Sequence, residues 1–267
     1  MDTRLITLTN DGYKEITNNM MHSLRKFNLL SRLTVFCLDS KVKEYLQNIY
    51  PDSKYEIISN TGSENLIDFR RSGWNHIVFY KMRAIYDSLN KYDRVLFIDG
   101  DIVFYRNPLD NLENEIGDKD VIFQTDLIVS NDKYNYYFEQ ISKFKTAQEL
   151  ADYIMECGYL RTEVNTGFIY LKNTQKNIDF FDYKKIDIDT FECDQIYVNK
   201  NLKELNFKLM PIFTYPTGLF IKSLYFTILK SMPPDLGICH NVIHFNYTIA
   251  SLNKVQTIKA MNSWYIE

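Results

Sequence analysis

The stretch that decides the fold is YDRVLFIDGDIVFYRNPL, residues 92–109, in which a short apolar run ends abruptly in two carboxylates. Residues 95–98 (VLFI) are aliphatic or aromatic throughout, and a second apolar run, residues 102–104 (IVF), follows Asp99-Gly100-Asp101 at once. A run this short and this uniformly apolar is typical of a strand buried on both faces, in the middle of an α/β sheet.

The two carboxylates after this strand point to a ligand. Asp99 and Asp101 are costly at the end of a buried strand unless a cation or hydrogen-bond donors meet them. Gly100 lets the backbone turn and lets a ligand approach closely. A hard divalent cation, with phosphate oxygens completing its shell, fits such a pair. The alternative is a solvated Asp-Gly-Asp turn. A second Asp-x-Asp match, Asp187–Asp189, follows lysines rather than an apolar run.

Composition narrows the class of protein. The 267 residues are 45% hydrophobic, with nine glycines and six prolines, which predicts a globular chain with a sizeable core, as one large α/β domain or two small ones. Thirty-one basic residues against thirty-four acidic ones give a net charge of −3, and no basic tract is present. A nucleic-acid partner is therefore not expected.

Three features bear on the compartment. No stretch approaches the ~18 uninterrupted apolar residues of a transmembrane segment. Residues 1–14 show no basic region followed by an apolar run, so no signal peptide is expected. The four cysteines form no Cys-x-x-Cys pair, which favours free thiols in a reducing compartment. We expect a cytoplasmic protein, in a bacterial or viral-host cytoplasm, with peripheral contact to a membrane surface left open.

Strands and helices alternate ahead of the acidic strand. The predicted strands are 4–9, 33–38 and 55–58, and the predicted helices are 14–27, 41–49 and 74–89. This order predicts a mostly parallel sheet with helices on both faces. Ligands of such sheets bind beyond the carboxyl ends of the strands, where Thr7, Thr9, Asn10 and Asp39 fall. Asp39 is equally well explained as the N-cap of the next helix.

Four more residues, before and after the acidic strand at 95–98, carry polar groups that could bind a ligand. Lys81, in the helix that precedes the acidic strand, could meet a diphosphate or hold an aspartate in place. Asn165 lies in a polar turn, NTG, that enters an apolar strand ending at residue 171, and its short side chain can hydrogen-bond a ligand. Asp194 and Gln195 open a helix predicted over 193–201, where Asp194 is either an N-cap or a ligand group.

The remaining elements are simpler to read, except for one histidine. Residues 109–119 look like a polar connection, 120–125 like a short strand and 207–215 like a strand. A lone histidine at the end of an apolar segment, such as His244, is usually structural. Yet one histidine and two aspartates form a plausible ligand set for Mn²⁺ or Mg²⁺, since imidazole suits manganese better than magnesium.

In this order the segments resemble nucleotide-diphospho-sugar transferases of the GT-A fold, in particular the retaining Asp-x-Asp group that includes glycogenin-like enzymes and plant cell-wall galactosyl-, arabinosyl- and xylosyltransferases. The likeness runs over most of the chain. The motifs that carry it are Thr7-x-x-Asn10-Asp11-Gly12-Tyr13, Lys81, Phe97-Ile98-Asp99-Gly100-Asp101 with Asn107-Pro108-Leu109, Asn165-Thr166-Gly167-Phe168, Asp194-Gln195, and His244-x-Asn246 with Lys254 and Trp264.

The resemblance implies a single GT-A domain over residues 1–267. Its nucleotide-binding half would be 1–110, and its acceptor-side half 111–267, with a C-terminal segment for the metal and the diphosphate. The implied metal ligands are Asp99, Asp101 and His244, around Mn²⁺ or Mg²⁺. The implied donor-binding residues are Thr7, Thr9, Asn10, Lys81, Asp99, Asn165, Gln195 and Lys254, and the implied catalytic residues are Asp194, Lys254 and Asp99.

The resemblance also implies a reaction, namely transfer of a sugar from a nucleoside-diphosphate sugar, a UDP-sugar in the first instance, with retention at the anomeric carbon. The acceptor would be a glycan, a lipid-linked glycan or a protein. Retention needs either a same-face route or a carboxylate nucleophile such as Asp194. The spacing from His244 to Lys254 is longer than in glycogenin, which weakens the assignment of Lys254. One alternative is a non-catalytic nucleotide-sugar or glycan-binding module. Another is a metal-dependent phosphohydrolase, but such enzymes usually carry more clustered Asp or His ligands than this chain has.

Overall fold

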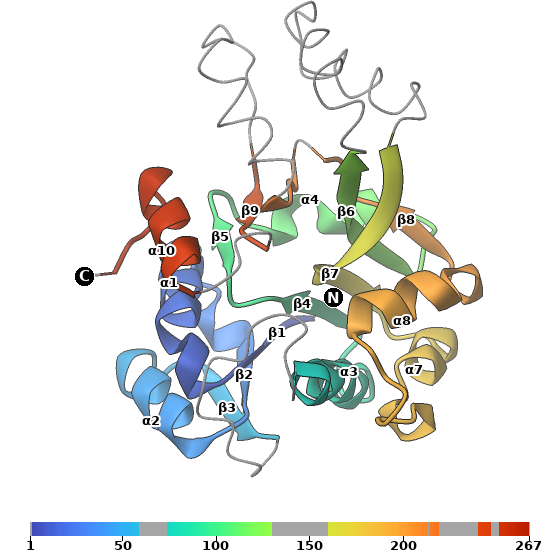
Figure 1. The fold of residues 1–267 in the computed structure, drawn as a ribbon, viewed down its shortest axis with the longest axis horizontal. Coiled ribbons are helices and arrows are strands. Elements are labelled where there is room, and N and C mark those ends of the chain that lie inside the picture. Colours follow the sequence, from blue (N-terminus) through green and yellow to red (C-terminus); the bar gives the residue numbers. More distant parts are fainter. Residues whose placement is uncertain are drawn as a thin grey trace, which may run out of the picture.

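A computed structural model describes residues 2–58, 74–129, 160–212, 214–218, 240–246 and 251–266 of the chain (Figure 1). A seven-stranded sheet in the order β3-β2-β1-β4-β7-β6-β8 forms its centre. Its strands are β1 (Thr3–Thr9), β2 (Leu33–Cys37), β3 (Lys54–Ile57), β4 (Arg94–Ile98), β6 (Val121–Val129), β7 (Leu160–Lys172) and β8 (Phe207–Leu209). Only β7 runs antiparallel to its neighbours, β4 and β6. The predicted mixed, mostly parallel α/β sheet is therefore confirmed.

Helices cover both faces of this sheet. One core contains β-strand side chains packed with α1, α2 and α4, and the other contains those packed with α3, α7 and α8, which group together in Figure 1. The helices are α1 (Lys14–Arg25), α2 (Ser40–Ile49), α3 (Trp74–Leu89), α4 (Leu109–Ile116), α7 (Gln175–Phe180), α8 (Asp194–Asn201) and α10 (Ser251–Ala260). Among the described helices, none is long and apolar enough to cross a membrane.

The apolar run at residues 95–98 is the central strand β4, between β1 and β7. Leu96 and Ile98 belong to the core under α1 and α2, whereas Val95 and Phe97 belong to the core under α3 and α8. All four side chains are fully buried. Because alternate residues of a strand point to opposite faces, a strand with helices on both sides must be apolar at every position.

Leu96→Ala should therefore destabilise the fold, by about 2–5 kcal/mol, because it leaves a cavity in a closely packed core. Equilibrium unfolding in urea measures the change. Ile49→Ala is the control, since Ile49 is 40% exposed and its truncation should change stability by no more than about 0.5 kcal/mol. Equal effects of the two substitutions would contradict the central position of β4.

A second, two-stranded sheet explains how distant parts of the chain meet. After Asp101 the chain leaves the main sheet as β5 (Ile102–Phe104), which pairs antiparallel with β9 (Val242–His244). In this register Ile102 lies opposite His244, and the amide of Phe245 donates to the carbonyl of Asp101 at 3.1 Å. The pairing fixes His244 beside the two carboxylates that end β4.

Two predicted elements were wrong. Residues 109–116 form helix α4 rather than a polar connection, because Pro108 can precede a helix and Leu112 and Ile116 bury one side of it. The strand predicted over 207–215 stops at Leu209. Pro211 cannot donate to a ladder, and its carbonyl instead accepts from the amides of Thr214 and Tyr215 in a turn.

Candidate functional site

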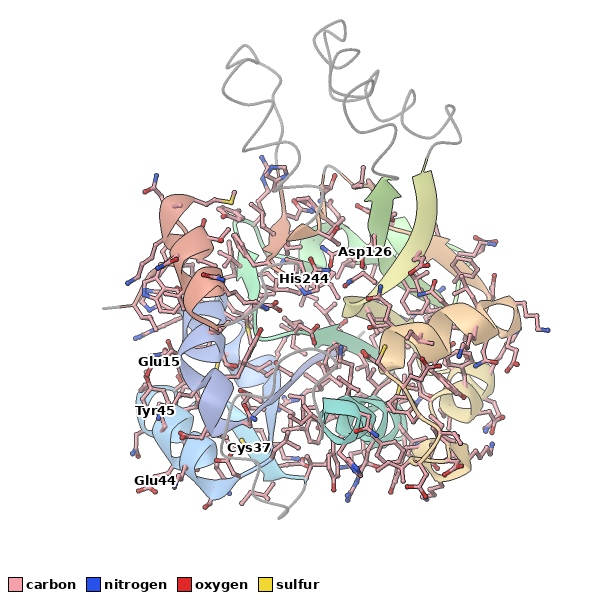
Figure 2. All side chains as sticks on the ribbon, viewed as in Figure 1. Glu15, Cys37, Glu44, Tyr45, Asp126 and His244 are labelled. Atoms are coloured by element: carbon pink, nitrogen blue, oxygen red, sulfur yellow. The ribbon has the colours of Figure 1, made fainter. Side chains whose placement is uncertain are left out.

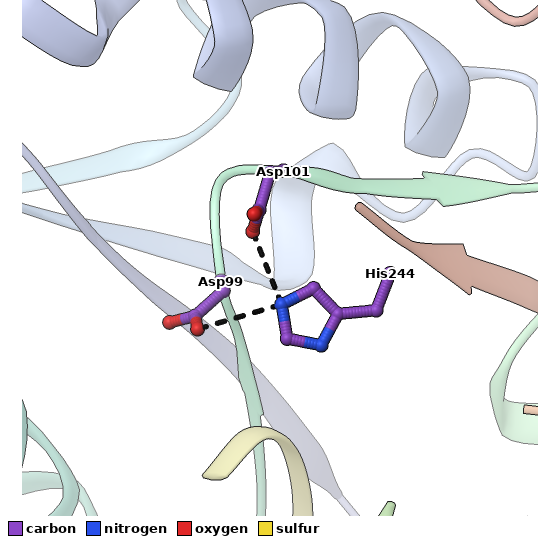
Figure 3. A group of neighbouring side chains, drawn as sticks. All are labelled: Asp99, Asp101 and His244. Carbon is purple, nitrogen blue, oxygen red and sulfur yellow. Dashed lines mark ion pairs between the residues drawn. The ribbon is translucent and has the colours of Figure 1, made fainter. Parts of the chain in front are cut away.

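Asp99, Asp101 and His244 converge where β4 and β9 end (Figure 3). The Nε2 atom of His244 lies 3.2 Å from Oδ1 of Asp101 and 3.7 Å from Oδ2 of Asp99. One ligand atom from each residue lies within 4.8 Å of the others, as the ligands of a single ion would. The sequence predicts that His244 and Asp101 lie close together, and the structure places them 3.2 Å apart. Their role as metal ligands stays a prediction.

The chemistry of these three side chains fits a divalent cation. His244 is 1% exposed, its Nδ1 lies 2.9 Å from Oε1 of Gln124, and its Nε2 has no hydrogen-bond partner among the described residues. A buried polar atom without a partner is costly, so the position of Nε2 between two carboxylates calls for a ligand. Two carboxylate oxygens and one imidazole nitrogen form a donor set suited to Mn²⁺, and less well to Mg²⁺.

Lys254, from α10, neutralises one of the two carboxylates. Its Nζ lies 2.5 Å from Oδ2 of Asp101 and 2.5 Å from the hydroxyl of Tyr13. Burial alone would raise the pKa of Asp101, but the Lys254 ammonium and then His244 hold that pKa well below its ordinary value. The same contacts raise the pKa of Lys254 against the opposing effect of burial. Asp101 is thus an ionised, buried carboxylate with one oxygen, Oδ1, directed at His244.

Lys81, from α3, pairs with the other carboxylate, that of Asp99, and also with Asp194. Its Nζ lies 3.0 Å from Oδ1 of Asp99 and 2.7 Å from Oδ2 of Asp194, which also accepts from the Thr166 hydroxyl at 2.7 Å. Burial lowers the pKa of Lys81, but Asp194 and Asp99 outweigh it and raise that pKa. Burial raises the pKa of Asp99 despite the Lys81 ammonium, and the negative charge of Asp101 raises it further. Asp99 and Asp194 are therefore joined through one buried cation.

The structure shows whether Asp194 and Asp39 act as helix N-caps. Asp194 is the first residue of α8 and does not cap it, since Sγ of Cys193 accepts from the amide of Ile196. Its carboxylate turns to Lys81 instead. Asp39 does cap its helix, accepting from the amide of Val42 at 2.9 Å.

A carboxylate that the sequence did not single out, Asp126, lies next to the predicted sugar-binding residues. Asn165 and Gln195 each donate to its Oδ2 at 3.0 Å, and Asn246 donates to its Oδ1 at 3.4 Å. Asp126 is 1% exposed and is labelled with His244 in Figure 2. It directly follows the strand predicted over 120–125, so the rule that ligand groups follow buried strands could have found it.

Comparison with known proteins assigns the chain to a family. Residues 28–258 match the sequence profile of the nucleotide-diphospho-sugar transferases. The chain belongs to this family. It is therefore a glycosyltransferase, and the resemblance of its motifs to nucleotide-diphospho-sugar transferases is confirmed. No curated protein sequence matches it.

Solved glycosyltransferases share the fold of this transferase at low sequence identity. The galactosyltransferase LgtC, in complex with donor and acceptor sugar analogs, has 14% identity and a TM-score of 0.52, over 91% of this chain and 87% of LgtC. An active-site mutant of LgtC has 11% identity and a TM-score of 0.52, over 99% of this chain and 97% of the mutant. GlyE of Streptococcus pneumoniae has 11% identity and a TM-score of 0.50, over 99% of this chain and 61% of GlyE. The chain spans 45% of the bifunctional glycosyltransferase WbbM.

The predicted nucleotide-binding residues of the transferase lie at the carboxyl end of β1. Thr7, Thr9 and Asn10 are all buried there, and the Thr9 hydroxyl bonds that of Thr17 at 2.8 Å. The Thr7 hydroxyl has no hydrogen-bond partner in the part of the chain that the structure describes. This end of β1 reaches the carboxylate site through Tyr13, whose hydroxyl accepts from Lys254.

Proposed function

We propose that this transferase moves a sugar from a UDP-sugar to a glycan, lipid-linked glycan or protein acceptor, with Mn²⁺ (or Mg²⁺) as cofactor and retention at the anomeric carbon. The observation that carries the proposal is the convergence of Asp99, Asp101 and Nε2 of His244, which has no hydrogen-bond partner among the described residues. The family supplies the reaction class, and LgtC, whose fold this chain shares, was solved with donor and acceptor sugar analogs.

The charges of the site suit departure of a nucleoside diphosphate. Transfer builds negative charge on the leaving phosphate and positive charge on the anomeric carbon. When bound by Asp99, Asp101 and His244, a divalent cation supplies Lewis-acid stabilisation and orients the diphosphate. Lys254 forms an ion pair with Asp101, so its ammonium is placed to add positive charge beside the leaving group.

The surroundings of Asp194 favour the same-face route to retention. A nucleophilic carboxylate needs a free oxygen in line with the anomeric carbon. Oδ2 of Asp194 is paired with Lys81 and accepts from Thr166, so this oxygen is not free and the ammonium draws electron density from the whole carboxylate. A carboxylate engaged in this way is a poor nucleophile, and we assign it to orienting the sugar, together with Asn165 and Gln195.

We extend the proposal to the rest of the chain. Residues 1–267 act as one domain, in which the half 1–110 binds the nucleotide and the half 111–267 faces the acceptor. Thr7, Thr9 and Asn10 contact the nucleobase and ribose. The buried hydroxyl of Thr7, which no described residue partners, supports this role. The free, buried thiols of Cys37 and Cys193 suit a reducing compartment and so support a cytoplasmic location.

A nucleotide-release assay tests the proposed function. The protein is incubated with Mn²⁺ and a panel of UDP-sugars and GDP-sugars, and release of UDP or GDP is followed with and without EDTA. We expect release from at least one UDP-sugar, abolished by EDTA and restored by added Mn²⁺. NMR of the sugar product should show the same anomeric configuration as in the donor. Binding without release would instead support a non-catalytic nucleotide-sugar-binding module. Release from GDP-sugars alone would contradict the choice of nucleotide.

Lys254→Met is expected to change metal binding and transfer in opposite directions. Its Nζ holds Oδ2 of Asp101, so its removal frees that oxygen and removes a like charge. The affinity of the nucleotide-free protein for Mn²⁺ should then rise about tenfold. Transfer should fall about a hundredfold, because a cation beside the leaving phosphate is lost.

Electron paramagnetic resonance of free Mn²⁺ measures the affinity, and UDP release measures transfer. Lys259→Met is the matched control, because Lys259 lies on the same helix but is exposed and contacts Trp264. It should leave both quantities unchanged. Weaker Mn²⁺ binding in Lys254→Met would show that Lys254 does not compete for Asp101.

A further inference from the structure

Gln124 is the residue behind the metal-facing histidine. It is fully buried on β6, where the pairing of β6 with β7 is irregular. Phe123 pairs with Ile169, but Gln124 pairs with Asn165, so the register shifts between them. Irregularities of this kind re-aim a side chain, and here the Gln124 amide reaches His244, 120 positions later in the chain.

The orientation of the Gln124 amide is fixed by its other partners. Its Nε2 donates to the carbonyl oxygens of Tyr215 and Pro216, at 3.0 Å each. Carbonyls accept and cannot donate, so the NH₂ end must face them. The oxygen end, Oε1, therefore faces Nδ1 of His244 at 2.9 Å.

This orientation selects one tautomer of the imidazole. An amide oxygen only accepts, so Nδ1 of His244 must carry the proton. In the neutral ring the lone pair then lies on Nε2, the atom directed at Asp99 and Asp101. We propose that Gln124 is a positioning residue, which holds His244 in the tautomer that can ligate the metal through Nε2. The inference rests on the metal site of the proposed function.

The competing tautomer shows why such a residue is needed. With a proton on Nε2, His244 could donate to Oδ1 of Asp101, which is 3.2 Å away. That bond would occupy both atoms that the metal requires. Gln124 favours the ligating form by giving Nδ1 an acceptor. Because Pro216 also accepts from the amide of His244 at 3.1 Å, the same contacts hold the histidine backbone in place.

The Mn²⁺ affinities of four proteins test the inference. Gln124→Leu removes the acceptor and should weaken Mn²⁺ binding 10- to 100-fold, the usual effect of losing a partner behind a metal ligand. Gln124→Glu keeps an acceptor for Nδ1 and should bind within about threefold of the wild type. Thr125→Val is the control, since Thr125 is the next residue of β6 and donates to Met210. It should bind Mn²⁺ as the wild type does.

The two Gln124 variants separate positioning from simple packing. Both lose the two donations to Tyr215 and Pro216, so a purely structural role predicts equal losses of affinity. Equal losses, or wild-type affinity in Gln124→Leu, would overturn the inference. Circular dichroism and thermal unfolding establish that each variant is folded.

A measurement on the wild type covers the case in which a variant does not fold or no metal binds. Two-bond ¹⁵N–¹H spectra of protein labelled at its four histidines report the tautomer of each ring. His244 should carry its proton on Nδ1, with Nε2 unprotonated, at pH 8 in the metal-free protein. A proton on Nε2 would overturn the inference. If the wild type binds no Mn²⁺ but shows the expected tautomer, the metal site fails and the role of Gln124 in setting the tautomer stands.

Discussion

Asp101→Asn is expected to lower sugar transfer by about a thousandfold or more. Asparagine keeps the size of the side chain but removes the charge that faces Nε2 of His244 at 3.2 Å. The loss of one electrostatic group at the reacting centre typically costs 10²–10³ in rate, and loss of a metal ligand should cost no less. UDP release at saturating donor and several Mn²⁺ concentrations measures the effect.

Two controls keep this result interpretable. Asp101→Asn leaves the buried Lys254 without its carboxylate, and breaking a buried pair costs about 3–5 kcal/mol, so the unfolding transition must be measured alongside. Asp99→Asn is cleaner, because Lys81 keeps Asp194 at 2.7 Å, and it should also abolish transfer. Asp187→Asn, in the exposed second Asp-x-Asp match, should have no effect. Full transfer by a folded Asp101→Asn protein would refute the site.

Gly167→Ala is expected to disrupt the same site from the opposite side. A Cβ at this position would lie 2.1 Å from Cε1 of His244 and 2.6 Å from Oδ2 of Asp99, well inside van der Waals contact. Its backbone cannot retreat freely, because the carbonyl of Gly167 accepts from the amide of Asp99 at 2.7 Å. The methyl group would separate two of the three ligands. Mn²⁺ affinity should fall by about a hundredfold or more, and transfer with it.

Gly117→Ala is the matched glycine control. Gly117 ends α4 at a φ of 52°, and the nearest atom to a Cβ there is a carbonyl oxygen at 4.0 Å. An alanine at this position should cost about 1 kcal/mol in backbone strain without altering Mn²⁺ binding. Calorimetry of Mn²⁺ binding compares the two proteins. Wild-type affinity in Gly167→Ala would show that the ligands do not meet as the structure places them.

The centre of the fold and the two carboxylates of the proposed metal site were predictable because each depends on a local pattern. A uniformly apolar run predicts a strand covered on both faces, and β4 is one. Two carboxylates at the end of that strand predict a cation. The histidine needed a resemblance as well, since the pairing of β5 with β9 that places Ile102 opposite His244 is a long-range contact with no local signal.

The supporting residues could not be predicted from the sequence in the same way. Gln124 lies inside an apolar strand, and the direction of its side chain depends on a register shift that only the folded sheet reveals. Lys254 was expected beside a diphosphate, and its pairing with Asp101 and Tyr13 depends on where α10 packs. Helix α4 was missed because only two of its eight residues, Leu112 and Ile116, are buried.

The most direct test of the account is the position of the metal itself. Crystals soaked with MnCl₂ and UDP, measured at the manganese absorption edge, locate the ion by its anomalous scattering. The account predicts one strong peak within bonding distance of Asp101, of Nε2 of His244 and of Asp99, with UDP phosphate oxygens on its open side. UDP bound without a manganese peak at these three residues, or a peak elsewhere in the chain, would contradict it.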